Sequence, residues 1–251
     1  SDDGRYAIDG ALIDLAGRKG ITADLARTVV RTNATVIAAL AVHRGEADAM
    51  ICGVEGRYDR HLRWVRDIVG KAPGVEEFSA LSLLILPHGA YFLADTYVTP
   101  VPSAEEIAEM VRLAAIHVRR FGMEPKFALL SHSNFGSADT DSARKMRRAV
   151  EILMDSDPGL EVDGEMHGDA ALDEALRRRV YPRSRLAGQA NVFIMPNLDS
   201  ANIAYELLKA LADALPVGPI LIGPAKPAHI LTPSVTARGV VNMTAVAVAE
   251  A

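Results

Sequence analysis

Apolar runs of strand length alternate along this chain with stretches of helical periodicity. Several runs are continuously apolar, which is typical of strands that helices cover on both faces. Aromatic residues make up only 5% of the chain, which suits helices packed on buried strands better than an all-β sandwich. The alternation predicts an α/β sandwich with a mainly parallel sheet. The runs expected to form strands are residues 47–52, 81–86, 91–94, 127–130, 191–195 and 219–222.

Capping residues and apolar spacing predict helices between these strands. Ser103 begins a capping box with Glu106, Thr22 caps a second helix, and a third begins near Asp199. The alanine-rich run 240–249 is expected to form a buried helix, with a subunit contact as the alternative. The side chains expected to face inward are Ile107, Met110, Val111, Ala114 and Val118 in the first helix, Leu25, Val29, Val36, Ile37 and Leu40 in the second, and Ile203, Leu207, Leu208, Leu211 and Leu215 in the third.

Composition narrows the class of protein. The 251 residues, 49% of them hydrophobic, can bury the core of one large domain or two modest ones. A net charge of −5 argues against a nucleic-acid partner. The single cysteine, Cys52, excludes an internal disulfide and is expected to be an inert core thiol. Because we find no run of membrane-spanning length and no signal peptide, we expect no membrane association and a cytoplasmic location.

Two proline-rich passages, residues 99–102 and 218–227, lie between regular elements. We interpret them as hinges between two lobes. The second lobe is expected at residues 100–218, and the first at 1–99 plus 219–251. A cleft between the lobes would then be the binding site.

The loop Ser131-His132-Ser133-Asn134-Phe135-Gly136-Ser137 follows the apolar run 127–130 and precedes a helical pattern. A helix N-terminus offers free N–H groups to an anion, and small hydroxyl residues permit close approach. The expected ligand is a phosphorylated or acyl-carrying small molecule. In the alternative interpretation, the serines merely cap the next helix.

Other polar clusters have two interpretations each. The basic runs 144–148 and 177–179 could attract a phosphate, but a solvated helix face is the commoner explanation. Asn197, Asp199 and Asn202 open the third predicted helix, where they could act as caps or contact a ligand.

The ordered motifs of this chain resemble the phosphate acetyl/butyryltransferase family. More narrowly, they resemble the C-terminal phosphotransacetylase-like domain of the large bacterial NADP-dependent malic enzymes. The similarity runs the length of the chain. The segments that carry it are Gly-Glu-Ala-Asp-Ala-Met-Ile-Cys-Gly (45–53), Leu-Leu-Ser-His-Ser-Asn-Phe-Gly-Ser (129–137), Asp-Gly-Glu-Met-His-Gly-Asp-Ala-Ala (163–171), Pro-Asn-Leu-Asp-Ser-Ala-Asn-Ile-Ala-Tyr (196–205) and His-Ile-Leu-Thr-Pro-Ser-Val-Thr-Ala-Arg-Gly (229–239).

The resemblance implies a two-lobed α/β/α fold of the isocitrate and isopropylmalate dehydrogenase type, with a cleft for coenzyme A esters. The family's domain normally begins with further strand and helix units that this chain lacks. In the malic enzymes it resembles, acetyl-CoA inhibits a linked region that oxidises malate to pyruvate with NADP and a divalent metal. This chain contains no Gly-x-Gly-x-x-Gly dinucleotide turn. A homo-oligomer is also implied.

Three positions depart from the pattern of the active transferases. Pro233 occupies the place of a catalytic arginine, and Gly239 that of an active-site aspartate. Phe135 replaces a basic residue of the loop. Proline and glycine side chains supply neither a cation nor a base. We therefore expect no catalytic residues in this chain.

The binding residues implied by the resemblance remain. Glu165, His167 and Asp169 alternate and could bind a metal, but the related transferases carry a similar pattern without one, so hydrogen bonding is favoured and no metal site is expected. His132 could be a general base, although an ordinary hydrogen-bonded histidine is favoured. The residues expected to contact ligand are Ser133, Asn134, Gly136, Ser137, Arg63, Thr232 and Asn202.

These features predict a degenerate transferase domain that senses acetyl-CoA. One alternative is a working phosphate acetyl/butyryltransferase in which Arg238 replaces the missing arginine. A second is a structural oligomerisation module.

Overall fold

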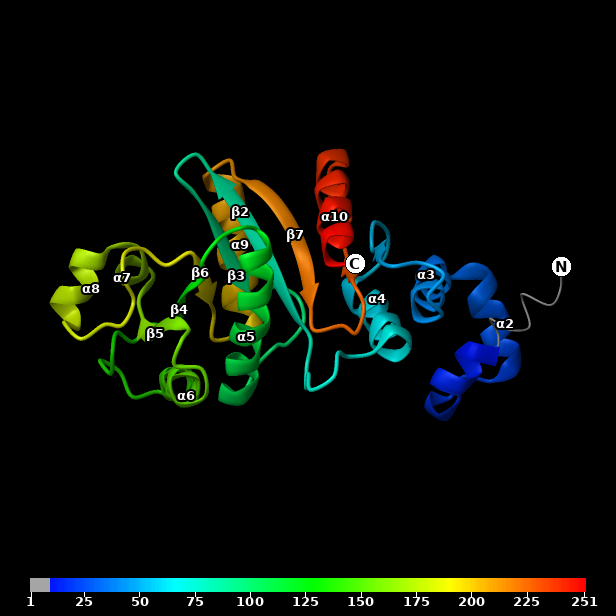
Figure 1. Cartoon of the computed structure of the whole chain (residues 1–251), viewed down its shortest axis with the longest axis horizontal. Helices are drawn as coiled ribbons and strands as arrows, with labels where there is room; N and C mark the ends of the chain where they lie inside the picture. Colours follow the sequence, from blue (N-terminus) through cyan, green and yellow to red (C-terminus); the bar gives the residue numbers. More distant parts are fainter. Residues whose placement is uncertain (1–9) are drawn as a thin grey trace. The chain divides into compact units, whose positions relative to one another are not determined.

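The computed structural model describes residues 10–251, which form two compact units (Figure 1). Among these residues, unit 1 runs from residue 10 to Val75 and continues with Pro219–Ala251, and unit 2 is Glu76–Gly218. The second boundary, between Gly218 and Pro219, falls within the strand Leu215–Ile222. The first lies at Val75, not at residue 99, because residues 79–94 form a hairpin in the sheet of unit 2.

The larger sheet has the strand order β5-β4-β6-β3-β2-β7. Its strands are β2 (Ser79–Leu86), β3 (Gly89–Ala94), β4 (Lys126–Leu130), β5 (Glu161–Met166), β6 (Val192–Ile194) and β7 (Leu215–Ile222). The β2–β3 hairpin is antiparallel, whereas β3–β6, β6–β4 and β4–β5 are parallel. The predicted α/β fold with a mostly parallel sheet is confirmed. Sequence reasoning missed β5, because its acidic residues interrupt the apolar pattern that marks a buried strand.

The sheet of unit 2 is covered on both faces. Its helices are α5 (Ala104–Arg120), α6 (Asp141–Ser156), α7 (Gly168–Leu172), α8 (Glu174–Val180) and α9 (Leu198–Leu211). Figure 1 shows α5 in front of the sheet and α9 behind it. Successive residues of β3 serve the two faces: Phe92 meets Phe121 at the end of α5, and Leu93 joins the cluster that contains Ala201 and Tyr205 of α9.

Helix α5 forms as predicted. The Ser103 side chain accepts a hydrogen bond from the Glu106 N–H, and the Glu106 carboxylate accepts one from the Ser103 N–H. These two bonds satisfy donors that a helix start leaves open. The five predicted inward positions are all buried: Ile107, Met110, Val111, Ala114 and Val118.

The prediction for α9 is wrong about which face is buried. Ile203, Leu207, Leu208 and Leu211 are 57%, 54%, 43% and 82% exposed. Small Ala201 and the ring of Tyr205 face the sheet instead, and the fifth predicted inward residue, at position 215, belongs to β7. Apolar periodicity shows that a stripe exists but not what covers it. This stripe is uncovered within unit 2.

Unit 1 holds a two-stranded parallel sheet, in which β1 (Met50–Cys52) pairs with β8 (Ala228–Ile230). Gly53 adopts φ +92°, and a Cβ there would lie 2.4 Å from the carbonyl oxygen of Leu231, so only glycine permits this close approach. The other elements are a 3₁₀-helix (Gly17–Lys19), α2 (Ala23–Thr32), α3 (Ala34–His43), α4 (Tyr58–Trp64), a π-helical segment (Val65–Val69) and α10 (Ala237–Glu250).

The helix predicted after Thr22 is two helices. Asn33 takes an extended conformation after α2, and its side chain caps α3 by accepting from the Val36 N–H. In the part of the chain described, no helix by itself is both long and apolar enough to cross a membrane. Helices α2 and α3 reach that length and hydropathy only when they are taken together, and the chain bends by 101° between them.

The run 240–249 is helical, as predicted, but it is not buried. Only Met243 and Ala247 of α10 are buried, whereas Val241 and Val248 are 67% and 69% exposed. Alanine and valine raise the hydropathy of the run without defining a single inward face. The expectation of a buried helix is therefore wrong within this unit.

Cys52 ends β1 and is partly buried. Burial raises the pKa of its thiol to about 11, against a smaller opposing effect of the hydrogen bond with Thr35. Because the thiolate is the reactive form, this thiol is unreactive near neutral pH.

Arg177 is the largest fully buried side chain described, contrary to the favoured interpretation of the run 177–179 as a solvated face. Its guanidinium donates to the carbonyl oxygens of Ala170, Leu186 and Gly188 at 2.8, 2.9 and 2.6 Å. It also donates to the Ser184 hydroxyl at 3.1 Å. One side chain thus holds together the end of α7 and the loop after α8.

We expect Arg177→Met to destabilise unit 2 by about 3 kcal/mol or more, because buried carbonyl groups lose their donor at a cost of about 1–3 kcal/mol each. Thermal unfolding and hydrogen exchange of residues 182–188 measure the effect. Arg179→Gln, on the exposed side of α8, is the control and should stay within about 0.5 kcal/mol of wild type. Equal effects of the two substitutions would contradict the assigned role.

Candidate functional site

The 131–137 loop connects β4 to the segment before α6. Its serines do not cap that helix, because Thr140 does so by accepting from the Ala143 N–H. The capping interpretation of the loop is therefore wrong. Gly136 and Ser137 are exposed and Asn134 is partly exposed, whereas Ser133 is fully buried.

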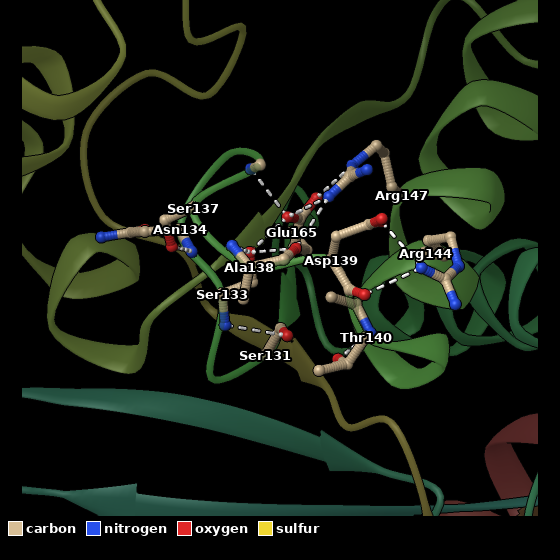
Figure 2. A network of polar contacts seen from close by, with 12 residues as sticks. Ser131, Ser133, Asn134, Ser137, Ala138, Asp139, Thr140, Arg144, Arg147 and Glu165 are labelled. Carbon is tan, nitrogen blue, oxygen red and sulfur yellow. Dashed lines mark hydrogen bonds and ion pairs between the residues drawn. The ribbon is translucent and has the colours of Figure 1, made fainter.

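Glu165, on the neighbouring strand β5, is hydrogen-bonded to the loop (Figure 2). Its Oε1 accepts a hydrogen bond from the Ser133 hydroxyl at 2.7 Å and one from the Gly136 N–H at 2.8 Å. Its backbone carbonyl accepts from the Phe135 N–H at 2.8 Å. Parallel pairing of β4 with β5 brings the end of one strand beside the other, so a single residue can organise the whole turn.

Arg147 of α6 completes the Glu165 site. Its Nε lies 3.1 Å from Oε2 and its Nη2 3.0 Å from Oε1, in a bidentate ion pair. Burial by itself would raise the pKa of Glu165, but the bonds from Arg147, Ser133 and the Gly136 N–H outweigh burial and lower that pKa below its ordinary value. The carboxylate is therefore ionised at neutral pH.

Further bonds fix the outer part of the loop. The Asn134 side-chain oxygen accepts from the His167 N–H at 3.1 Å, and the Ser137 hydroxyl accepts from the Asn134 N–H at 2.8 Å. His167 Nε2 lies 2.8 Å from the carbonyl oxygen of His132. The loop is thus preorganised, with the small residues Gly136 and Ser137 left at its surface.

Phe135 takes the position of the loop where the resemblance implies a cation. It has φ +47°, a left-handed conformation that is uncommon for a residue with a Cβ, and its ring stacks on Tyr181 at 4.7 Å between centroids. The ring therefore makes an apolar contact at the position where the resemblance implies a charge.

The alternating acidic and histidine residues of this region do not converge. Glu165 binds Arg147 and the loop, His167 faces the His132 carbonyl, and Asp169 accepts from the N–H of its neighbour Ala170. Across residues 10–251, no group of three or more His, Cys, Asp or Glu side chains is placed to hold a metal ion.

Arg63 lies in unit 1, on α4, and lines a hollow of about 350 Å³ together with Arg57, Arg60 and Trp64. Arg60 and Arg63 lie three residues apart on one side of α4, and Arg57 is the extended residue just before the helix. This spacing is a signal visible in the sequence. Arg57 is engaged by both carboxylate oxygens of Asp59, at 2.9 and 2.8 Å. Arg63 is 65% exposed and lies 3.7 Å from a carboxylate oxygen of Asp67, which leaves it accessible to an anion.

The remaining predicted positions are spread over both units. In unit 1, the Thr232 and Ser234 hydroxyls lie 3.0 Å apart on either side of exposed Pro233. Gly239 lies in the first turn of α10, where a Cβ would come within 2.8 Å of a Val235 methyl group. In unit 2, the Asn202 amide donates to the carbonyl oxygen of Thr96 at 3.3 Å, so this residue has a structural partner.

Sequence comparison decides the family. The model of the phosphate acetyl/butaryl transferase family matches residues 4–248. The chain belongs to this family. It is 62% identical to an NAD-dependent malic enzyme of Rhizobium meliloti, over 94% of this chain and 31% of that protein. It is 51% identical to an NADP-dependent malic enzyme of Escherichia coli, over 93% of this chain and 31% of that protein.

The fold is also that of solved members of the family. A phosphotransacetylase from Streptococcus pyogenes aligns with a TM-score of 0.91 at 29% identity, covering 98% of this chain and 74% of that one. This chain spans only about 31% of the length of the malic enzymes named above. Similarity to both groups confirms the resemblance on which the sequence analysis relied.

We expect Glu165→Gln to loosen the loop by about 1–3 kcal/mol, because the bidentate ion pair and the charge-assisted bonds are lost. Since the folded-state pKa is lowered, the charge stabilises the fold above the unfolded pKa of about 4.3, and that stability is lost as pH falls through the folded value. Thermal unfolding between pH 3 and 7 should therefore show a weaker acid dependence in the variant. Glu151→Gln, on α6, is the matched control; an acid profile of Glu165→Gln identical to wild type would contradict the argument.

Proposed function

We propose that this chain is a regulatory acetyl-CoA-binding domain of a malic enzyme and has no transferase activity of its own. The observation that carries the proposal is the contrast at the loop. Glu165 accepts three hydrogen bonds from the loop and two from Arg147, and Arg147 donates one more to the Ala138 carbonyl. Phe135, by contrast, occupies the position where the resemblance implies a cation. A loop kept in shape without its charged group fits recognition better than turnover.

The surface of the loop suits a thioester ligand. Gly136 and Ser137 are exposed and small, and Asn134 is partly exposed, so an acyl group can approach the backbone closely. In unit 1, Arg63 supplies an accessible cation for a phosphate of coenzyme A. Thr232 adds a hydroxyl in the same unit.

Turnover would need groups that these positions lack. Phe135 and Pro233 carry no charge with which to stabilise a phosphoryl oxyanion, and Gly239 cannot accept the thiol proton. Loss of one transition-state donor costs about 100- to 1,000-fold in rate. The helical position and tight surroundings of Gly239 leave little room for the aspartate that the resemblance implies there.

The length of the malic enzyme relatives supports a partner in the same polypeptide. About two thirds of each named malic enzyme lies outside the matched region. We assign malate decarboxylation, a divalent metal and the nicotinamide cofactor to that linked region. The cofactor that the resemblance implies is NADP, and the names of the relatives include both NAD and NADP. Acetyl-CoA then acts as effector, and the whole protein works as a cytoplasmic homo-oligomer.

Isothermal calorimetry with acetyl-CoA tests the proposal on this chain. We expect saturable binding, and a loss of affinity of about tenfold in Arg63→Gln, because a charge-assisted bond to phosphate contributes about 1.5–3 kcal/mol. Arg31→Gln, an exposed arginine of α2, is the matched control and should bind as wild type does. Absence of heat with acetyl-CoA would overturn the proposal. In the full-length protein, acetyl-CoA should also change malate turnover.

An assay with acetyl phosphate and coenzyme A tests the missing activity. We expect no turnover above that of buffer, because cation and base are absent from positions 135, 233 and 239. Robust turnover would favour the active transferase, in which exposed Arg238 replaces the missing arginine. In that case Arg238→Gln would abolish the activity.

A structural oligomerisation module is the second candidate function. The uncovered stripe of α9, formed by Ile203, Leu207 and Leu211, favours it, because apolar residues exposed together commonly mark a protein contact. Self-association of the chain, together with no heat of binding on titration with acetyl-CoA, would identify the structural oligomerisation module. Self-association together with saturable binding is what the regulatory domain predicts.

A further inference from the structure

Unit 2 contains a cavity of about 430 Å³ on the outer side of the sheet, beside the edge strand β5. It lies among β5, α6 and the loop that follows α8. The volume falls within the range of small-molecule sites, roughly 300–1,000 Å³. Arg177 bonds to the segment 182–188 through Ser184, Leu186 and Gly188, so this wall of the cavity is held by hydrogen bonds to a buried side chain.

The lining of this cavity carries three arginines, Arg147, Arg183 and Arg185, and three acids, Glu151, Asp163 and Glu165. Glu165 is neutralised by Arg147, and Glu151 by Arg148. Two further arginines line the cavity, Arg183 and Arg185. Neither has a carboxylate within ion-pair distance among residues 10–251, and the Arg185 guanidinium donates to the carbonyl of Pro158 at 3.2 Å.

The third acid of the lining, Asp163, is also engaged. Its side chain is buried and accepts from the Ser184 hydroxyl and the Arg185 N–H, both at 2.7 Å. Its other oxygen accepts from the Gly164 N–H. The lining charges without an ion-pair partner among the accessible side chains are therefore the guanidinium groups of Arg183 and Arg185. Guanidinium groups bind phosphate through planar paired donors.

The rest of the lining is aromatic and apolar. The stacked rings of Phe135 and Tyr181 stand on one side, and Val150 and Met154 of α6 contribute aliphatic surface. Tyr181 is 39% exposed, so the stack has an accessible edge. Aromatic rings beside arginines are the surroundings in which proteins bind nucleobases and their phosphates.

We propose that this cavity binds a nucleotide, with the base against the Phe135–Tyr181 pair and the phosphate on Arg183 and Arg185. The same chemistry has two sources, a free nucleotide or the nucleotide end of coenzyme A. For a free nucleotide the site does not depend on the acetyl-CoA proposal, because the cavity lies wholly within unit 2 and does not use Arg63. For the nucleotide end of coenzyme A, the site rests on that proposal. A nucleotide bound here would touch the 131–137 loop through Phe135.

Calorimetry with AMP and, separately, with coenzyme A tests the site on this chain. We expect AMP to bind with millimolar or better affinity, and Tyr181→Leu and Arg183→Gln to weaken it about tenfold each, since stacking and phosphate pairing are lost. Both residues are exposed, so both variants should fold, which circular dichroism checks. Arg179→Gln, an exposed arginine of α8 outside the cavity, is the matched control and should leave binding unchanged.

The outcomes separate the two sources and the two proposals. Weakened AMP binding in the cavity variants identifies a free nucleotide; weakened coenzyme A binding, with no AMP binding, identifies the nucleotide end of the coenzyme. If neither ligand is weakened by Tyr181→Leu and Arg183→Gln, the site is overturned. Arg63→Gln should leave AMP binding unchanged, so failure of the acetyl-CoA proposal would not remove this one.

Discussion

The buried carboxylate of Glu165 is the contact on which the candidate site depends. It lies on β5, beside the end of β4, and meets a hydroxyl, a backbone N–H and a guanidinium at once. A buried charge is tolerated only when it is paired and hydrogen-bonded, and here every bond goes to the loop or to the helix behind it. The carboxylate and the loop therefore require one another.

The 131–137 loop leaves its small residues exposed and packs its aromatic residue against the protein. Gly136 and Ser137 stay exposed, whereas Phe135 is held in a left-handed conformation and packs on Tyr181. The proposed thioester contact and the proposed nucleotide cavity thus share one short segment. Two ligands that contact one preorganised segment have a direct physical route for coupling, and such coupling would be reciprocal.

Local signals in the sequence predicted local structure well. The capping box at Ser103, the apolar run before the 131–137 loop and the N-cap at Asn197 all form as expected. Prediction failed where burial is decided by distant parts of the chain. The stripe of α9 lacks a cover within its unit, and the first hinge was misplaced because the β2–β3 hairpin joins the sheet of unit 2.

By itself, the sequence determined the fold class, the family and the loop that carries the candidate site, because spacing and motif residues follow one another along the chain. Only the tertiary structure decided that Glu165 anchors this loop, that Arg177 is a buried organiser and that Phe135 meets Tyr181. Those pairings join residues up to 46 positions apart (Phe135 to Tyr181). The sequence does not distinguish a carboxylate or guanidinium that is hydrogen-bonded to water from one that is hydrogen-bonded to a buried partner.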